Sequence, residues 1–231
     1  MDGVNTLSEY SSKRAIDIVI ATLMLLASMP LFLCIAAWIW LKDGGPVFYA
    51  HERVGRNGRR FGCLKFRSMV KNSAEILTEI LENDPEARAE WEASQKLRDD
   101  PRIIPGVGQF LRKSSLDELP QLINVLRGDM SLVGPRPVTE AELAHYGEYL
   151  DHYLALRPGM TGPWQVSGRS DTDYSQRVRL DASYASQNSI LSDLSIMATT
   201  LPAVVARRGA YVIPGALLLQ AMDLGALLTR S

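Results

Sequence analysis

The sequence predicts an α+β protein that is mainly α-helical, with a membrane helix near the N-terminus, amphipathic interfacial helices and a small β-hairpin. Three observations predict it. Residues 18–41 are apolar and carry no charge. Several later segments repeat apolar residues at helical spacing. Only two short segments, 47–49 and 61–66, have the composition of strands.

The apolar block is long enough to enter a membrane. A helix over residues 18–41 would reach ~36 Å, against ~30 Å for the hydrocarbon core of a bilayer. Pro30 removes a backbone donor and clashes with the carbonyl of Leu26, which predicts a kink. Basic residues flank both ends of the block, so the positive-inside tendency does not indicate which end faces the cytoplasm. A kinked spanning helix and a re-entrant helix that bends at Pro30 both fit this pattern.

Charge is divided between two consecutive segments after this helix. Residues 42–70 hold seven Lys or Arg and two acids, whereas residues 71–100 hold four and nine. The basic segment is expected to lie on anionic headgroups and the acidic segment to face solvent. The two short strands flank Arg56-Asn57-Gly58, a turn that predicts the hairpin.

Helical spacing marks the acidic segment and the region after it. Residues 76–81 carry an apolar stripe, and Asp84-Pro85 separates this helix from a second one. Leucine and isoleucine at i, i+3, i+4 and i+7 predict a helix over residues 116–127, which Gly128 is placed to end.

Asp117 and Glu118 fall in the first turn of the helix predicted over residues 116–127, and two interpretations compete. Ser115 with Glu118 makes a capping box, and acids in a first turn favour the helix dipole. Alternatively, a helix N-terminus suits phosphate and keeps a nearby carboxylate ionised for attack or metal binding. Phosphoryl transfer also needs cations, and basic residues lie close in sequence at Arg112, Lys113 and Arg136. Spacing alone favours the capping interpretation.

Other possible sites carry weaker signals. Asp171-Thr172-Asp173 is a DxD motif, the metal-binding pattern of many nucleotide-sugar glycosyltransferases, but it lies in a polar loop. The cysteines, Cys34 and Cys63, make no disulfide framework, which fits a reducing compartment. The three histidines match no metal spacing, and neither a Walker-type loop nor GxGxxG is present.

Several long motifs are spread along most of the chain. They are Lys13-Arg14-x-x-Asp17, Arg53-Val54-Gly55, Lys65-Phe66-Arg67-Ser68-Met69, Arg112-Lys113-Ser114-Ser115-Leu116-Asp117-Glu118-Leu119-Pro120-Gln121, Gly128-Asp129-Met130-Ser131-Leu132-Val133-Gly134-Pro135-Arg136-Pro137, Arg157-Pro158-Gly159-Met160-Thr161-Gly162 and Gln165-Val166-Ser167-Gly168-Arg169. Together they resemble the bacterial sugar transferases, the monotopic polyprenyl-phosphate hexose-1-phosphate transferases that initiate exopolysaccharide synthesis. The resemblance runs from residue 13 to about residue 211.

The resemblance implies a two-step transfer from a UDP-hexose to undecaprenyl phosphate. Asp117 would attack the sugar-linked phosphate and release UMP, and the polyprenyl phosphate would then take the covalent phospho-sugar. Glu118 would hold Mg²⁺ beside Asp117. Residues expected to contact phosphate or nucleotide are Lys65, Arg112, Arg136, Arg157 and Arg169. The pattern leans toward galactose, with glucose as the second candidate.

The resemblance also implies a re-entrant helix on the cytoplasmic face of the bacterial inner membrane, in contact with membrane lipids. The family usually has Ser-Pro at the membrane break, whereas Met29 precedes Pro30 here and the serine is Ser28. A homodimer is compatible with the sequence, and no nucleic-acid partner is expected. The expected parts are an N-terminal tail at 1–12, the re-entrant helix at 13–42, a catalytic domain at 43–211 that includes the apolar segment 190–205, and an apolar tail at 212–231.

Overall fold

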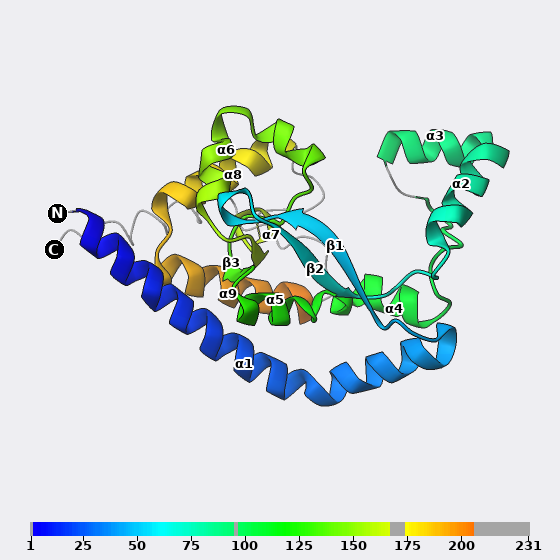
Figure 1. The fold of residues 1–231 in the computed structure, drawn as a ribbon, viewed down its shortest axis with the longest axis horizontal. Helices are drawn as coiled ribbons and strands as arrows, with labels where there is room; N and C mark the ends of the chain where they lie inside the picture. The colour runs from blue at the N-terminus through cyan, green and yellow to red at the C-terminus, as the bar shows by residue number, and fades with distance from the viewer. Residues whose placement is uncertain (1, 95–96, 167–173, 206–231) are drawn as a thin grey trace. The chain divides into compact units, whose positions relative to one another are not determined.

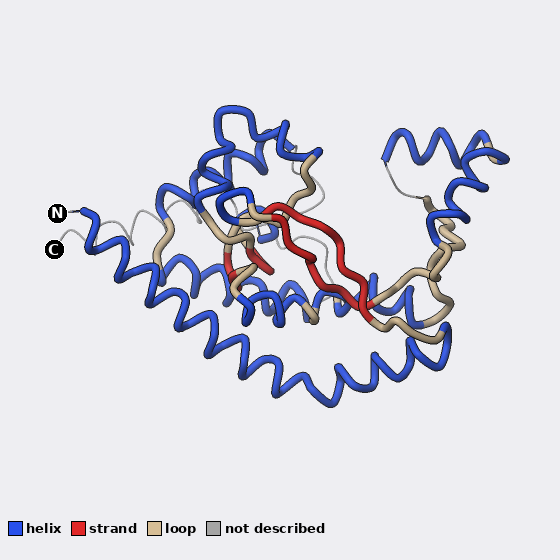
Figure 2. The backbone as a smooth tube through the Cα atoms, viewed as in Figure 1, coloured by secondary structure: helices blue, strands red, loops and turns tan. Residues whose placement is uncertain are grey.

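The computed structural model describes residues 2–94, 97–166 and 174–205. The chain divides into two compact units. The larger unit contains Met1–Ser28, Ala50–Leu64 and the chain from Pro120 onward; the smaller unit contains Met29–Tyr49 and Lys65–Leu119. Helices predominate in the described residues, with two small two-stranded sheets (Figures 1 and 2). The mainly helical α+β class is therefore confirmed.

Helix α1 runs from Asp2 to Asp43 and includes the predicted membrane segment. Within it, Ser11–Asp43 is long and apolar enough to cross a membrane, by length and composition. The boundary between the two units falls between Ser28 and Met29, next to Pro30. The hydroxyl of Ser28 donates to the carbonyl of Leu25 at 3.3 Å. The re-entrant course of this helix stays a prediction.

The predicted hairpin is present and longer than expected. Strands β1 (Phe48–Val54) and β2 (Arg60–Phe66) form a two-stranded sheet. The 3-10 turn η1 (Arg56–Gly58) joins them, with Asn57 in the left-handed region at φ 57°. In the larger unit, the Asn124 side chain joins β2 through Gly62 and Leu64, each at 2.9 Å. The amide of Asn124 thus completes backbone hydrogen bonds that a strand edge would leave open.

The larger unit contains a second, parallel sheet that local patterns did not predict. Strand β3 (Ser131–Val133) pairs with β4 (Gly159–Thr161), with Ser131 opposite Gly159. A Cβ atom at Gly134 would lie 2.5 Å from the carbonyl oxygen of Arg157. Glycine is needed there because the two backbones pass too closely for any side chain.

Helical segments make up most of the rest of the larger unit. They are α5 (Gln121–Arg127), η3 (Ala141–Tyr149), α6 (Leu150–Ala155), α7 (Pro163–Val166), α8 (Tyr174–Gln187) and α9 (Ile190–Val205). A buried cluster of Val138, Tyr146, Tyr153 and Val178 packs η3, α6 and α8 together. Helix α9 leaves Leu191 and Leu194 exposed. Its location at a membrane interface stays a prediction, and the predicted tail at 212–231 lies outside the described residues.

The smaller unit begins with the second half of α1. It adds the acidic helices α2 (Ser73–Asn83) and α3 (Pro85–Ser94), then α4 (Val107–Ser114) and the 3-10 turn η2 (Leu116–Glu118). The predicted break at Asp84 is confirmed, because its carboxylate caps α3 by accepting from the amides of Glu86 and Ala87 at 2.9 and 3.0 Å.

Two sets of aromatic contacts pack α1 onto the rest of the smaller unit. The Phe32 ring lies 4.7 Å from the Phe66 ring between centroids, and the Trp38 ring lies 5.7 Å from that of Phe110 on α4. The second half of α1 is thus packed against the helix that leads into the acid pair.

The helix predicted over residues 116–127 is wrong in its first third. Residues Leu116–Glu118 form only a 3-10 turn, and the α-helix begins at Gln121. Pro120 accounts for the break, because it has no N–H to donate to the preceding turn; Leu119 itself keeps an α backbone conformation at φ −50°. The predicted end is confirmed: Gly128 takes φ 89° and closes α5.

Candidate active site

The acid pair lies on η2, directly after α4. Ser115, which lies between α4 and η2, has φ 58°, and its side chain makes no capping hydrogen bond to η2. The capping box predicted from Ser115 and Glu118 is therefore wrong, because a left-handed Ser115 cannot present its hydroxyl to the next turn. The capping interpretation depended on a hydrogen bond to the Ser115 side chain, which is absent. Asp117 and Glu118 are therefore available for another role.

Both acids turn toward one lysine of the smaller unit. The Nζ atom of Lys65 lies 2.7 Å from Glu118 Oε1 and 3.4 Å from Asp117 Oδ2. The side chain of Asp117 is 15% exposed, that of Lys65 28% and that of Glu118 36%. The pair therefore forms a half-buried site in which two carboxylates converge on a single cation.

Burial raises the pKa of Asp117 above its ordinary value, and Glu118 raises it further, while the positive charge of Lys65 opposes both. The sequence led us to expect that a helix N-terminus would keep this carboxylate ionised. In the structure the positively charged group facing Asp117 is a lysine from β2. Lys65 thus has the electrostatic role that was assigned to the helix dipole.

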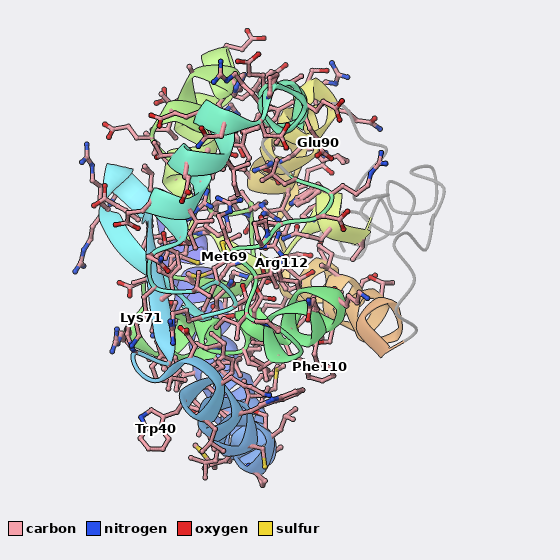
Figure 3. The ribbon with its side chains drawn as sticks, turned by 90° about the vertical axis from the view of Figure 1, so that its right-hand side faces the viewer. Trp40, Met69, Lys71, Glu90, Phe110 and Arg112 are labelled. Carbon is pink, nitrogen blue, oxygen red and sulfur yellow. The ribbon has the colours of Figure 1, made fainter. Side chains whose placement is uncertain are left out.

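Arg112 belongs to the same unit as the acid pair. It is exposed on the last turn of α4, two residues beyond Phe110 (Figure 3). Burial raises the pKa of Asp100, but the hydrogen bonds and charge of Arg102, with a smaller contribution from Arg112, lower it below its ordinary value. Arg102 forms a buried ion pair with that carboxylate at 2.7 Å. The guanidinium of Arg112 lies on the surface of the unit that carries Asp117, where a phosphate can reach it.

The other predicted arginines belong to the larger unit. Arg136 follows β3, and its guanidinium lies 5.3 Å from the centre of the Trp164 ring. Arg157 donates from Nε to the carbonyl of Gly128 at 2.7 Å, which satisfies a group at the end of α5. Arg169 and the DxD acids Asp171 and Asp173 lie outside the described residues.

Comparison with known proteins decides the family. The family model for bacterial sugar transferases matches residues 8–207. The chain belongs to the bacterial sugar transferase family. The resemblance drawn from its motifs is therefore confirmed.

Curated relatives agree with this assignment. The chain is 53% identical over 213 residues to the undecaprenyl-phosphate galactose phosphotransferase of Salmonella typhimurium, covering 90% of this chain and 44% of that protein. It is 50% identical over 200 residues to the exopolysaccharide production protein ExoY of Sinorhizobium fredii, covering 87% and 88%. It is 38% identical over 219 residues to the UDP-glucose:undecaprenyl-phosphate glucose-1-phosphate transferase of Escherichia coli, covering 91% and 43%. The chain thus spans less than half the length of the first and third relatives.

For this member of the bacterial sugar transferases, the structure also tests whether the acid pair fits a magnesium ion. Magnesium is commonly held by one or two carboxylates together with substrate phosphates and water. Asp117 and Glu118 both reach the same nitrogen of Lys65, so their oxygens can face one cation. Among the described residues no group of three or more His, Cys, Asp or Glu could hold a metal. The two carboxylates fit an ion completed by substrate.

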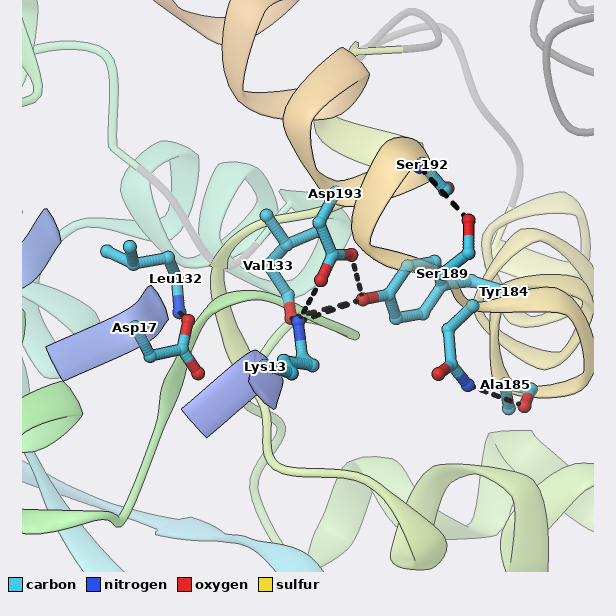
Figure 4. Close-up of polar contacts among 10 residues, drawn as sticks. Lys13, Asp17, Leu132, Val133, Tyr184, Ala185, Ser189, Ser192 and Asp193 are labelled. Atoms are coloured by element: carbon cyan, nitrogen blue, oxygen red, sulfur yellow. Dashed lines mark hydrogen bonds and ion pairs between the residues drawn. The ribbon is translucent and has the colours of Figure 1, made fainter. Parts of the chain in front are cut away.

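The first motif of this sugar transferase, Lys13-Arg14-x-x-Asp17, had no assigned role, and the structure supplies one. Lys13 pairs with Asp193 of α9 and donates to the carbonyl of Val133 at 3.1 Å (Figure 4). Asp17 accepts from the amide of Leu132 at 3.0 Å. The first half of α1 is thereby joined to β3 and α9. A lone acid in the apolar segment 190–205 was the sequence signal for this contact.

The sequence analysis also missed a cluster on α7 and α8. Arg177 lies 5.1 Å from the centre of the Trp164 ring and 4.9 Å from that of Tyr174. Asp181, one turn later on α8, accepts from the hydroxyl of Tyr146 at 2.8 Å. The i, i+4 spacing of Arg177 and Asp181 indicated only a surface ion pair, whereas both residues are buried.

Proposed function

We propose that this protein transfers hexose 1-phosphate from a UDP-hexose to undecaprenyl phosphate at the start of exopolysaccharide synthesis. Galactose is the favoured sugar and glucose the second candidate. The names of the relatives support this function: galactose and undecaprenyl phosphate are printed for the Salmonella protein, and exopolysaccharide production for the Sinorhizobium protein. Glucose is printed for the Escherichia coli protein.

One observation in the structure carries the proposal. Asp117 and Glu118, which are adjacent in sequence, converge on Lys65, 52 residues from Asp117, in a half-buried site. A nucleophilic carboxylate needs partial burial to become reactive and a cation to stay ionised. Asp117 has both, and its longer distance to Lys65 leaves it less tightly bound than Glu118.

In the first step, an oxygen of Asp117 bonds to the sugar-linked phosphorus of the UDP-hexose. The bond from that phosphorus to the oxygen bridging the two phosphates breaks, and UMP leaves with the electron pair. In the second step, an oxygen of undecaprenyl phosphate attacks the same phosphorus. The carboxylate of Asp117 is released, and the product is undecaprenyl diphosphate hexose.

Cations hold the phosphates during both steps. Arg112 lies in the same unit as Asp117, and Arg136, Arg157 and Arg169 are the other arginines that the family resemblance assigns to phosphate or nucleotide. Arginine suits this task because its planar fork can donate two hydrogen bonds to a phosphate. Magnesium bound by Asp117 and Glu118 would neutralise charge on the phosphate oxygens. Lys65 would then exchange its contact with the carboxylates for one with substrate.

The same proposal places α1 as a re-entrant helix on the cytoplasmic face of the inner membrane. Its apolar length, Pro30 and the basic residues at both ends support this course. A polyprenyl phosphate presents its headgroup at the membrane surface, so an enzyme on one face can reach both substrates. Cysteines introduced by Ser11→Cys and Lys42→Cys, in a background without Cys34 and Cys63, test it. An impermeant maleimide should label both from the same side, and labelling from opposite sides would establish a spanning helix.

The activity is tested with the full chain in nanodiscs, undecaprenyl phosphate and a panel of UDP-sugars. We expect UMP release that requires magnesium, and a UDP-sugar-dependent mass increase on Asp117. Release of UDP would indicate instead a metal-dependent glycosyltransferase that uses Asp171 and Asp173, and no product with any sugar would favour a non-catalytic membrane scaffold. Cross-linking the same protein in native membranes tests the homodimer.

A further inference from the structure

A cluster of cations and aromatic rings lies in the larger unit, away from the residues around Asp117 in sequence. We name it the Arg177 cluster and define it as Arg136, Trp164, Tyr174 and Arg177. Two guanidinium groups contact one indole ring, at 5.3 Å for Arg136 and 5.1 Å for Arg177. Arg177 also lies over the ring of Tyr174. Aromatic faces attract such cations and hold their planar groups in a fixed orientation.

The cluster contains donors that have no acceptor. In the part of the chain that the structure describes, Nε and Nη2 of Arg177, Nε1 of Trp164 and the hydroxyl of Tyr174 are buried and make no hydrogen bond. The whole Arg177 residue is only 9% exposed. Buried donors without partners are rare, and each raises the free energy of the folded state. Every unsatisfied atom of this set can donate, which points to a ligand rich in oxygen acceptors.

Two acids, Asp181 and Glu142, act electrostatically on the Arg177 cluster. The acid that contacts it is Asp181, and burial raises the pKa of this carboxyl to about 7 despite the charges of Arg177 and Arg136. Its Oδ2 accepts from Tyr146, and its Oδ1 makes no hydrogen bond among the described residues. The other nearby acid, Glu142, is already bound by Arg53 at 3.0 Å. The carboxyl one turn from Arg177 is therefore incompletely ionised, and an anion would add negative charge beside this buried guanidinium.

We propose that the Arg177 cluster binds a phosphate group of a substrate. The inference rests on the proposed function, which makes Arg136 a phosphate contact, and it adds Arg177, Trp164 and Tyr174 as ligands on α7 and α8. A phosphate offers several acceptor oxygens and negative charge, which match the unsatisfied donors and the positive charge of Arg177. The phosphate belongs either to the diphosphate of the UDP-sugar or to the polyprenyl phosphate.

The test measures binding to the full chain in nanodiscs by equilibrium dialysis of UDP, and by titration of polyprenyl phosphate into the same nanodiscs. Arg177→Met should weaken one of the two ligands by about 10- to 100-fold. Arg179→Met is the matched control, because Arg179 is an exposed arginine on the same helix; it should leave both affinities unchanged. The ligand that loses affinity identifies the source of the phosphate.

Tyr174→Phe separates a binding role from a structural one. It removes only a hydroxyl that has no hydrogen-bond partner among the described residues, so the melting temperature should not fall. Affinity for the same ligand should fall by about 2- to 10-fold. Wild-type affinity for both ligands in folded Arg177→Met and Tyr174→Phe would overturn the inference. The proposed function is tested separately, by formation of the adduct on Asp117 in the wild-type protein. It stands if that adduct forms, even when the Arg177 cluster binds no phosphate.

Discussion

Among the described residues, two lysine–aspartate pairs are largely buried, and their hydrogen bonding differs. In the larger unit, Lys13 bonds one oxygen of Asp193, and the hydroxyl of Tyr184 bonds the other at 2.5 Å (Figure 4). In the smaller unit, Lys65 lies 2.7 Å from Glu118 but 3.4 Å from Asp117. Both aspartates are mostly buried, with side chains 8% and 15% exposed.

Burial raises the pKa of each aspartate and the lysine opposes it, so electrostatics alone does not separate the two pairs. The two pairs differ in the hydrogen bonds made by the aspartate. Both oxygens of Asp193 are bonded within the fold, which suits a structural contact between α1, β3 and α9. Asp117 shares its lysine with a second acid that holds the shorter bond. A buried aspartate can attack a substrate only where the fold leaves its carboxylate weakly bound, and Asp117 meets that condition.

The largest effect is expected from Asp117→Asn. An amide cannot form the phospho-sugar bond, so UMP release should fall by at least about a thousandfold. The melting temperature should stay close to the wild-type value, because the long contact to Lys65 contributes little to folding. UMP release and thermal unfolding on one preparation check both statements. Full turnover by Asp117→Asn would show that another group is the nucleophile. The difference drawn between Asp117 and Asp193 would then have no catalytic meaning.

Asp193→Ala should lower stability and leave activity nearly unchanged, the opposite of Asp117→Asn. It leaves Lys13 without its carboxylate partner, so the free energy of unfolding should fall by about 3 kcal/mol, while turnover per folded molecule should change little. Asp151→Ala, at an exposed acid on α6, is the control and should stay within about 0.5 kcal/mol. Denaturant unfolding in detergent measures both variants. Equal stability of the two would mean that the Lys13 pair has no structural role.

Lys65→Met tests, through the pH dependence of the reaction, whether Lys65 controls the ionisation of Asp117. Asp117 must be ionised to attack, so the rate falls as the pH drops below its pKa. The charge of Lys65 lowers that pKa, and its removal should raise it further. The acidic limb of the rate of adduct formation should therefore move to higher pH, whereas Lys65→Arg should keep it near the wild-type position. An acidic limb that stays in place in Lys65→Met would show that Lys65 does not control Asp117.

The smallest effect is expected at an exposed ion pair. Arg60 contacts Glu52 and Glu140, but its side chain is 55% exposed and theirs are 68% and 64% exposed. Solvent screens such contacts, so Arg60→Met should change the free energy of unfolding by less than about 0.5 kcal/mol. The same unfolding assay measures it. A loss as large as that of Asp193→Ala would show that solvent exposure does not weaken an ion pair in this protein.

Local patterns predicted the elements that depend on neighbouring residues. The uncharged run of residues 18–41 determined the apolar part of α1, and Arg56-Asn57-Gly58 determined the hairpin turn. Gly128 marked the end of α5 because only a residue without a side chain adopts its backbone conformation easily. The motifs spread from Lys13 to Arg169 were together enough to identify the family.

Tertiary structure decided what those elements do together. Strands β3 and β4 pair in parallel across a long connection, and glycines such as Gly134 were the main trace of that approach in the sequence. Spacing suggested that Ser115 capped a helix over residues 116–127, but Pro120 and the left-handed Ser115 prevent it. Lys65 reaches the acid pair from a distant strand, and a local pattern contains no information on such a contact. The sequence by itself determined which groups could react, whereas folding determined which aspartate is fully bonded and which is left able to attack, because the number of bonds to a buried carboxylate depends on contacts between distant segments.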